Sequence, residues 1–382
     1  MQISMRFFPA ALGLTALLAA SQLGLITKIG EIGRWVLMLV GAWGALAWRT
    51  NNNDYFLKNL YAWFFVVVCF LSSIWSWMPA YSIFRSISVV LLFVCCFGGV
   101  RCWIDIYGNE EFFSQIEKLI GSYVLGNLVI GLVGFPNSWF GGLFRGVFAN
   151  PNQLAIVCGF CSAIFCRQLF KQFTFIRALF FLSAFISVLL SGGRTGTILF
   201  LFSSALVFIF QESRYKKLYN SLGAVCALVG IPFLLNKIQA YFLKSGTENL
   251  LSNRAWAWEV VEEKISNSPW LGHGFGTDGY IWDLYNIELG YRMHGTGSSY
   301  YGLLFQFGWV LTTLFILVLL VFSVRTLING VIYKDDRVVY GAILISGLLA
   351  AYTEPWLTSA GNAYAWLYWS MFAMAMNRME TK

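Results

Sequence analysis

The sequence predicts an all-α fold: a polytopic membrane helical bundle of about 12 transmembrane helices with one long loop outside the membrane. Of the 382 residues, 58% are hydrophobic and only 12% are charged, whereas about a quarter of the residues in an average soluble domain are charged. Apolar runs long enough to cross a bilayer recur along almost the whole chain. They lack the alternation of apolar and polar residues that marks membrane β-strands, so helical spans are expected.

These apolar runs place the predicted spans, which together make one transmembrane domain of residues 1–382. The N-terminus resembles a signal peptide, but no small-residue cleavage site follows it, so an uncleaved first span is expected. Residues 236–298 form one long polar and aromatic loop between the ninth and tenth spans, and such a loop commonly carries function. The spans are expected at 8–26, 32–48, 60–77, 84–103, 119–135, 152–166, 177–192, 197–210, 218–235, 299–322, 338–353 and 363–377.

The net charge of +8 is distributed unevenly between the two sides of the predicted bundle. One side holds sixteen Lys and Arg: Arg6, Arg49, Lys58, Arg101, Lys118, Arg167, Lys171, Arg177, Arg214, Lys216, Lys217, Arg325, Lys334, Arg337, Arg378 and Lys382. The short segments of the other side hold five: Lys28, Arg34, Arg85, Arg145 and Arg194. Because Lys and Arg favour the cytoplasmic side, both termini are expected there. The positive charge therefore reports topology, and no nucleic-acid partner is expected.

Arginines on the non-cytoplasmic side are the first candidates for a functional site. Arg85, Arg145 and Arg194 come from different short connections, and Arg254 opens a predicted helix in the long loop. A charge near the membrane is costly unless it is paired or lines a polar cavity, and the planar arginine fork suits phosphate oxygens. We therefore expect a site for a lipid phosphate or diphosphate. The alternative is that each arginine reaches lipid headgroups or pairs locally.

The predicted helix in "NRAWAWEVVEEKI" has one apolar face. Trp258, Val261 and Ile265 follow Arg254 at helical spacing, and Ser252 or Asn253 is a suitable N-cap. A cation in the first turn opposes the helix dipole, so helix stability alone does not explain Arg254.

Both histidines lie in the long loop. His294 directly precedes the tenth span, where an imidazole could accept a proton from a sugar hydroxyl; a structural hydrogen-bonding role is the alternative. His273 lies among glycines and is ranked lower. The nearby Gly274, Gly276 and Gly279 spell G-x-G-x-x-G, but no strand–helix unit surrounds them, so a dinucleotide site is rejected. No metal or ATP motif is found, and no cofactor is expected.

Aromatic residues concentrate in and just after the loop, where they could stack on sugars or form an interfacial belt. The cysteines fall in or beside predicted spans, so the C-x-x-C pair Cys158 and Cys161 is expected to be small core residues.

Four segments, read together, resemble in order and spacing the O-antigen ligase and Wzy-type polysaccharide polymerase family of bacterial membrane glycosyltransferases. They are "RGVFANPNQLA" (145–155), "LLSGGRTG" (189–196), "NRAWAWEVVEEKISNSPWLGHGFGT" (253–277) and "HGTGSSYYGLLFQFGWVLTTLFI" (294–316). The resemblance implies a bundle of about twelve helices that transfers glycan from undecaprenyl diphosphate to an acceptor hydroxyl without a metal ion. One departure is Gly295, where the family often has asparagine after the histidine.

The resemblance also implies roles for individual residues. His294, Arg194 and Arg254 are the expected catalytic residues. Substrate binding is expected from Arg145, Arg85, Asn152, Trp258 and Tyr300.

The expected function is therefore transfer of glycan at the periplasmic face of the bacterial inner membrane, with residues 236–298 as a periplasmic loop. The preferred acceptor is another lipid-linked repeat unit, which makes the protein a polymerase of O-antigen, capsule or exopolysaccharide. The alternative acceptor is lipid A-core, which makes it an O-antigen ligase. A further alternative is a flippase or transporter of lipid-linked oligosaccharide, which would favour polar groups at mid-span. Membrane lipids are expected partners in every case.

Overall fold

A computed structural model of the chain describes residues 6–47, 60–211, 252–284 and 295–380. It is almost entirely helical, as the composition predicts. The elements in order are α2 (Phe8–Ala19), α3 (Gly24–Ala47), α5 (Leu60–Leu71), the 3₁₀ turn η1 (Ser72–Ile74), α6 (Pro79–Phe93), the π-helical turn η2 (Val94–Val100), α7 (Arg101–Tyr107), α8 (Asn109–Leu132), β1 (Trp139–Phe140), β2 (Leu143–Phe144), α9 (Pro151–Lys171), α10 (Phe175–Ser191), α11 (Arg194–Phe210), α13 (Ser252–Ser266), the 3₁₀ turn η3 (Thr277–Tyr280), α14 (Ile281–Leu284), α15 (Ser299–Tyr333), α16 (Arg337–Thr353) and α17 (Ala365–Glu380).

Four of the described helical segments are long and apolar enough to cross a membrane: Gly24–Ala47, Pro79–Tyr107, Pro151–Lys171 and Ser299–Tyr333. Shorter apolar helices lie at Phe8–Ala19, Leu60–Ile74, Phe175–Ser191, Arg194–Phe210 and Arg337–Thr353. These helices support a membrane protein. The count of twelve spans stays a prediction, because the span expected at 218–235 lies outside the described residues, as does part of the loop 236–298.

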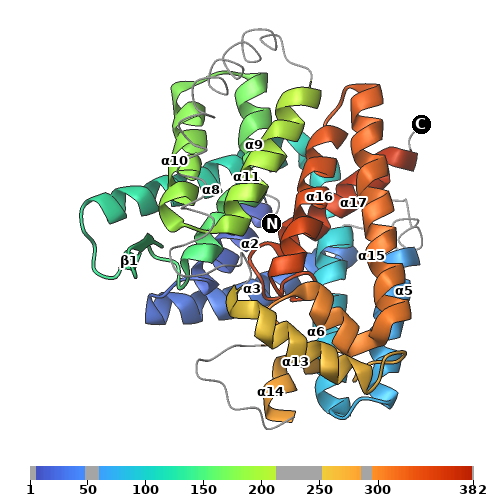
Figure 1. Cartoon of the computed structure of the whole chain (residues 1–382). Helices are drawn as coiled ribbons and strands as arrows, with labels where there is room; N and C mark the ends of the chain where they lie inside the picture. The colour runs from blue at the N-terminus through green and yellow to red at the C-terminus, as the bar shows by residue number, and fades with distance from the viewer. Residues whose placement is uncertain (1–5, 48–59, 212–251, 285–294, 381–382) are drawn as a thin grey trace.

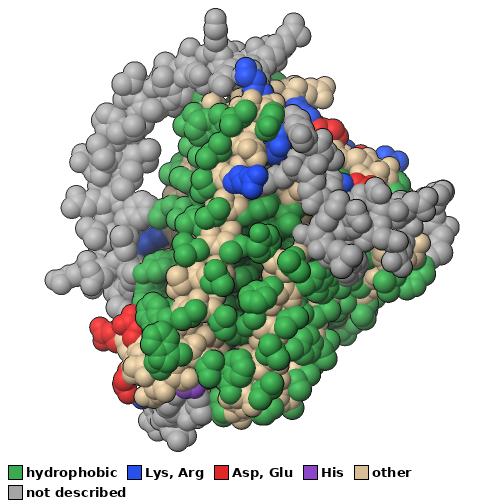
Figure 2. Space-filling model, turned by 90° about the vertical axis from the view of Figure 1, so that its right-hand side faces the viewer, with side chains coloured by type: hydrophobic (Ala, Val, Ile, Leu, Met, Phe, Trp, Pro, Cys, Tyr) green, Lys and Arg blue, Asp and Glu red, His purple; other side chains and the backbone are tan. Residues whose placement is uncertain are grey.

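The helices pack side by side, with α8 to α11 on one side of the bundle and α15 to α17 on the other (Figure 1). Helices α13 and α14 lie at the lower end of this view. Figure 2 shows a broad hydrophobic surface, with most of the visible Lys and Arg side chains gathered toward its upper end. Such a band of apolar surface is typical of a protein that sits in a bilayer.

Two helices extend well beyond their predicted spans. Helix α8 begins at Asn109, directly after Gly108, which has φ 87°. Its first turn contains Glu110 and Glu111, and acidic residues there complement the helix dipole. Helix α15 runs for 35 residues, to Tyr333. A hydropathy pattern marks only the apolar part of a helix, so both polar extensions were missed.

Helix α15 is broken at Gly308, whose φ of 71° and ψ of −174° are not helical. The segment 269–274 supplies the hydrogen bonds that the break removes: Trp309 N–H donates to the Pro269 carbonyl at 2.8 Å, and the N–H groups of His273 and Gly274 donate to the carbonyls of Phe305 and Gln306 at 2.8 and 3.0 Å. A side chain at position 308 would lie 2.4 Å from the Pro269 carbonyl oxygen. Glycine is therefore required for the close approach.

Helices α9 and α11 approach each other more closely than ordinary side chains allow. A Cβ atom on Gly196 would lie 2.4 Å from the carbonyl carbon of Ala155, and one on Gly159 would lie 2.9 Å from the Gly196 oxygen. Small residues allow such contacts between helices in membranes. Cys158 and Cys161 are buried in the same helix, which agrees with the prediction that they are core residues.

The bundle has two chemically different ends. The end at which α9 and α11 begin is called the Arg194 end, and the end at which α9 finishes is called the Arg167 end. At the latter, Arg167 is fully buried and donates to the carboxylates of Asp336 and Glu110. Its guanidinium also lies 4.1 Å above the ring of Phe113. This network ties the starts of α8 and α16 to the end of α9.

Candidate functional site

The turn between α10 and α11 presents Arg194 at the Arg194 end. Gly192 adopts the left-handed conformation (φ 63°) that ends α10, and Gly193 is the N-cap residue of α11. Arg194 is the first residue of α11 and is half-buried. A positive charge at a helix N-terminus is unfavourable for the helix itself. The position of this arginine is therefore not explained by the stability of α11, and its catalytic role stays a prediction.

Asn152 faces this turn from the start of α9. The helix begins at Pro151 and is capped by the Asn150 side chain, which accepts a hydrogen bond from Asn152 N–H at 2.8 Å. The Asn152 Oδ1 atom lies 3.5 Å from the point that a Cβ on Gly193 would occupy. The structure thus brings the predicted residues Asn152 and Arg194 together.

Arg145 lies in the loop beside the same turn and holds that loop in shape. Its Nε donates to the Asn137 carbonyl at 2.9 Å and its Nη1 to the Ala149 carbonyl at 3.1 Å. The hairpin of β1 and β2 places Leu143 against Gly192, because a Cβ on that glycine would lie 2.7 Å from the leucine side chain. Arg145 therefore belongs to this region and has a structural role. Its predicted binding of substrate stays a prediction.

Helix α16 joins the site through its last residues. Thr353 Oγ1 lies 2.9 Å from Thr195 Oγ1, directly beside Arg194. The preceding Tyr352 contacts two predicted residues, since its ring centroid lies 5.4 Å from that of Trp258 and 6.0 Å from that of Tyr300. Arg194, Trp258 and Tyr300 are thus linked by a short series of contacts.

Trp258 and Tyr300 are both held firmly. Trp258 is only 5% exposed, stacks on Tyr301 with ring centroids 4.8 Å apart, and donates from Nε1 to the Thr296 carbonyl at 3.1 Å. The burial of Trp258, Val261 and Ile265 confirms the predicted inner face of α13. Tyr300 donates to the Leu348 carbonyl at 2.8 Å. In this conformation the Trp258 ring is covered by protein, and Trp258 packs against Tyr301 and Tyr352.

Arg85 lies in a polar cluster with Gly276 and Asp278. A Cβ on Gly276 would lie 2.6 Å from the Arg85 side chain, and the Arg85 Nε is buried with no hydrogen-bond partner among the described residues. The neighbouring Asp278 accepts from Gln306 Nε2 at 2.7 Å, and Gln306 Oε1 accepts from Gly276 N–H at 2.9 Å. The expected convergence of Arg85 with the other arginines stays a prediction.

Burial raises the pKa of the Asp278 carboxyl to about 6, although Arg85 and the backbone N–H groups of Asp278 and Gly279 act in the opposite direction. The carboxyl thus changes charge close to neutral pH. Tyr81 and Tyr280, with ring centroids 5.0 Å apart, complete the ionisable surroundings together with Arg85.

We expect Asp278→Asn to remove a pH dependence of stability between about pH 4 and the folded-state pKa of Asp278. Because that pKa is raised, the folded state binds the proton more tightly than the unfolded state, and the wild type gains stability as the pH falls through about 6. Melting temperatures of both proteins in detergent measure this effect. The melting temperature of the wild type should rise relative to that of the variant as the pH is lowered. A difference in melting temperature that does not change with pH would contradict the raised pKa of Asp278.

The two other predicted catalytic residues cannot be placed. His294 lies outside the described residues, as does the side chain of Arg254, although α13 includes that position. The segment directly after His294 is anchored: the Gly295 carbonyl accepts from Trp282 Nε1 at 3.0 Å, and the Thr296 carbonyl accepts from Trp258. The roles of His294 and Arg254 stay predictions.

His273 has a structural environment, in agreement with its lower rank. Its ring stacks on Phe305 with centroids 4.3 Å apart, and its Nε2 lies 3.2 Å from the Lys264 carbonyl oxygen. Burial lowers the pKa of His273, with a partly compensating effect from that hydrogen bond.

Sequence reasoning missed three residues. Arg34 lies within α3, where its guanidinium donates to the Gly361 carbonyl and its Nε is buried without a partner among the described residues. In the sequence, Arg34 contributes only as one of the five positive charges expected on the non-cytoplasmic side. Asp278 and Tyr352 were not singled out, because a lone acid in a loop and a tyrosine at a span end carry no local signal. Across the described ranges, no group of three or more His, Cys, Asp or Glu side chains is arranged to hold a metal ion.

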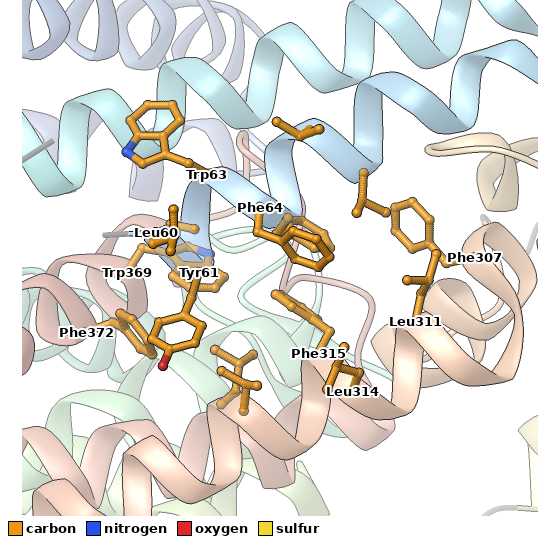
Figure 3. A pocket seen from close by; sticks show the side chains of 16 residues that line it. Leu60, Tyr61, Trp63, Phe64, Phe307, Leu311, Leu314, Phe315, Trp369 and Phe372 are labelled. Atoms are coloured by element: carbon orange, nitrogen blue, oxygen red, sulfur yellow. The ribbon is translucent and has the colours of Figure 1, made fainter. Parts of the chain in front are cut away.

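Helix α15 lines two pockets. The first, of about 520 Å³, lies between α13, α15 and α16 and is called the tyrosine pocket; it is lined by Glu262, Tyr300, Tyr301, Trp309 and Tyr352, among others. The second, of about 570 Å³, is almost wholly apolar. Side chains of α5 and α15 face each other across it, with Trp369 and Phe372 at one end (Figure 3). The apolar pocket suits hydrocarbon, and only the tyrosine pocket offers groups for a polar ligand.

Part of the chain matches a known protein family. Residues 178–316 match the family model described as O-Antigen ligase. The matched region contains Arg194, α13, Tyr300 and Tyr301 of α15, and the position of His294. No curated relative matches the chain.

Proposed function

We propose, from the O-antigen ligase family region at residues 178–316, that this protein is a glycosyltransferase of surface polysaccharide that acts at the periplasmic face of the inner membrane. The family match supports a membrane enzyme of polysaccharide synthesis. The observation that carries the proposal from family to site is the placement of Arg194, half-buried at the start of α11, beside Asn152 and Thr353.

In the proposed reaction, a hydroxyl oxygen of the acceptor bonds to the anomeric carbon of the lipid-linked glycan. The bond from that carbon to the diphosphate oxygen breaks, and undecaprenyl diphosphate leaves with the bonding electrons. Arg194 would stabilise the negative charge that develops on the diphosphate, together with Arg254. His294 would take the proton of the acceptor hydroxyl or orient that hydroxyl. No metal ion is required by this scheme.

Arg145 and Asn152 would help to place the donor, because both lie around the turn that presents Arg194. Arg85 would act separately, through the cluster with Asp278. Trp258 and Tyr300 would form the support for the glycan, and membrane lipid would surround the bundle.

The acceptor defines the biological role, and deletion of the protein distinguishes the candidates. If the acceptor is a lipid-linked repeat unit, a gel of surface polysaccharide should show lipid A-core capped by a single repeat. If the acceptor is lipid A-core, the gel should show bare core, and lipid-linked polymer should accumulate. An unchanged profile together with unchanged lipid-linked intermediates would contradict the proposed function.

A further inference from the structure

The tyrosine pocket has the shape and chemistry of a carbohydrate site. We propose that it binds a sugar ring without carboxylate or phosphate groups, a neutral hexose or amino sugar of the glycan being transferred. This inference rests on the proposed function, and it names a substrate class that the family match leaves open. The volume of the tyrosine pocket, about 520 Å³, falls within the range of ligand pockets.

The walls of the pocket offer accessible aromatic rings. Trp309 is 51% exposed and Tyr352 is 41% exposed. Behind them, Tyr301 stacks on the buried Trp258, with an interplanar angle of 20°. Rings held in this way present flat apolar faces with polar edges, which complement the apolar face of a sugar and its hydroxyl groups.

The polar group of the pocket is a carboxylate. Glu262 Oε1 accepts a hydrogen bond from the Tyr301 hydroxyl at 2.7 Å, which fixes the position of the acid. An ionised carboxylate has further acceptor sites, and these suit sugar hydroxyls or an ammonium group.

The surrounding charge disfavours an acidic ligand. Glu259 and Glu263 are exposed on α13 beside Glu262, and Lys264 is occupied by an ion pair with Glu263. Negative groups of a uronic acid would be repelled at this wall. The pocket therefore selects against the anionic sugars that the arginines at the site would otherwise tolerate.

The pocket adjoins the proposed reaction site through the end of α16. Tyr352 forms one wall, and the next residue, Thr353, contacts Thr195 beside Arg194. A sugar in the tyrosine pocket would thus contact Tyr352, which is joined through Thr353 and Thr195 to the arginine that is proposed to hold the diphosphate. Tyr300 lines the same pocket, which gives that predicted residue a defined place.

Binding to the full-length protein in lipid nanodiscs, measured by saturation-transfer NMR, tests this assignment. Maltotriose and chitotriose serve as neutral probes and trigalacturonic acid as the acidic probe. We expect the neutral probes to bind. Trp309→Ala or Tyr352→Ala should weaken that binding by about tenfold, equivalent to about 1.4 kcal/mol. Glu262→Gln should increase the binding of trigalacturonic acid.

Trp270→Ala is the matched control, because Trp270 is 68% exposed and does not line the pocket. The assignment is overturned if neither neutral probe binds, if trigalacturonic acid binds the wild type as tightly, or if Trp309→Ala loses no more binding than the control. Arg194→Lys separates the two proposals: it should retain sugar binding while it loses transfer. Absence of transfer by the wild type contradicts the proposed function. Transfer that persists in Arg194→Lys removes only Arg194 from the mechanism, and transfer by a wild type that binds no neutral probe contradicts only the pocket.

Discussion

Arg194→Lys is expected to lower glycan transfer by on the order of a hundredfold, the effect of removing one well-placed donor to a developing negative charge. Lysine keeps the charge but cannot form two parallel hydrogen bonds to a phosphate group. Because Arg194 begins α11 next to Gly193, the shorter reach of an ammonium group cannot be recovered by a small shift of the helix: a Cβ on Gly193 would already lie 2.5 Å from Ala155. Polymer formed by membranes that contain equal amounts of protein measures the effect.

Arg337→Lys is the matched control for this substitution. Arg337 is also the first residue of a 17-residue helix, but it lies at the Arg167 end and pairs with Asp335. The control variant should retain most of the transfer. Near-normal transfer by Arg194→Lys at a normal protein level would remove this residue from the proposed mechanism.

Arg167→Met is expected to destabilise the protein by about 3–5 kcal/mol, because it leaves acids without their buried partner. The Asp336 side chain is only 11% exposed and receives two hydrogen bonds of 2.8 Å from Arg167. Partial burial raises the pKa of Glu110, but hydrogen bonds from Arg167 and Lys171 outweigh it and hold the pKa at about 2. The melting temperature in detergent and the folded yield both measure the loss.

Arg6→Met provides the comparison, since the pair of Arg6 and Glu111 is well exposed and should contribute less than about 1 kcal/mol. Combining Arg167→Met with Asp336→Leu should recover part of the lost stability, because the unpaired acid is removed as well. Equal destabilisation by Arg167→Met and Arg6→Met would show that the buried network contributes little.

Several elements could be predicted from local sequence alone. The Asn-Pro-Asn run supplies the N-cap and first turn of α9, and two adjacent glycines form the turn before Arg194. The spacing of Trp258, Val261 and Ile265 predicted a buried helix face, and that prediction is confirmed. Each of these features depends on residues a few positions apart, so backbone propensity and periodicity suffice to predict it.

The partners of the charged residues could not be predicted in this way. Arg167 and Asp336 are 169 positions apart, and Arg85 meets Asp278 only because the 269–276 segment folds against α15. The sequence places such residues on a side of the membrane but does not say which of them face each other. The expectation of one shared arginine pocket therefore stays a prediction.

Because residues 269–274 bond to the broken turn of α15 through backbone atoms, the pairing is insensitive to most changes of side chain in that segment. Gly272 and Gly274 are exceptions. A Cβ on Gly272 would lie 2.4 Å from the Gln306 backbone, and one on Gly274, whose φ is 96°, would lie 2.3 Å from the Ser76 side chain. Adding or deleting a single residue would instead shift every donor away from its acceptor and leave buried carbonyls unsatisfied. Across homologous chains, we therefore expect this segment to vary in residue type while its length stays constant.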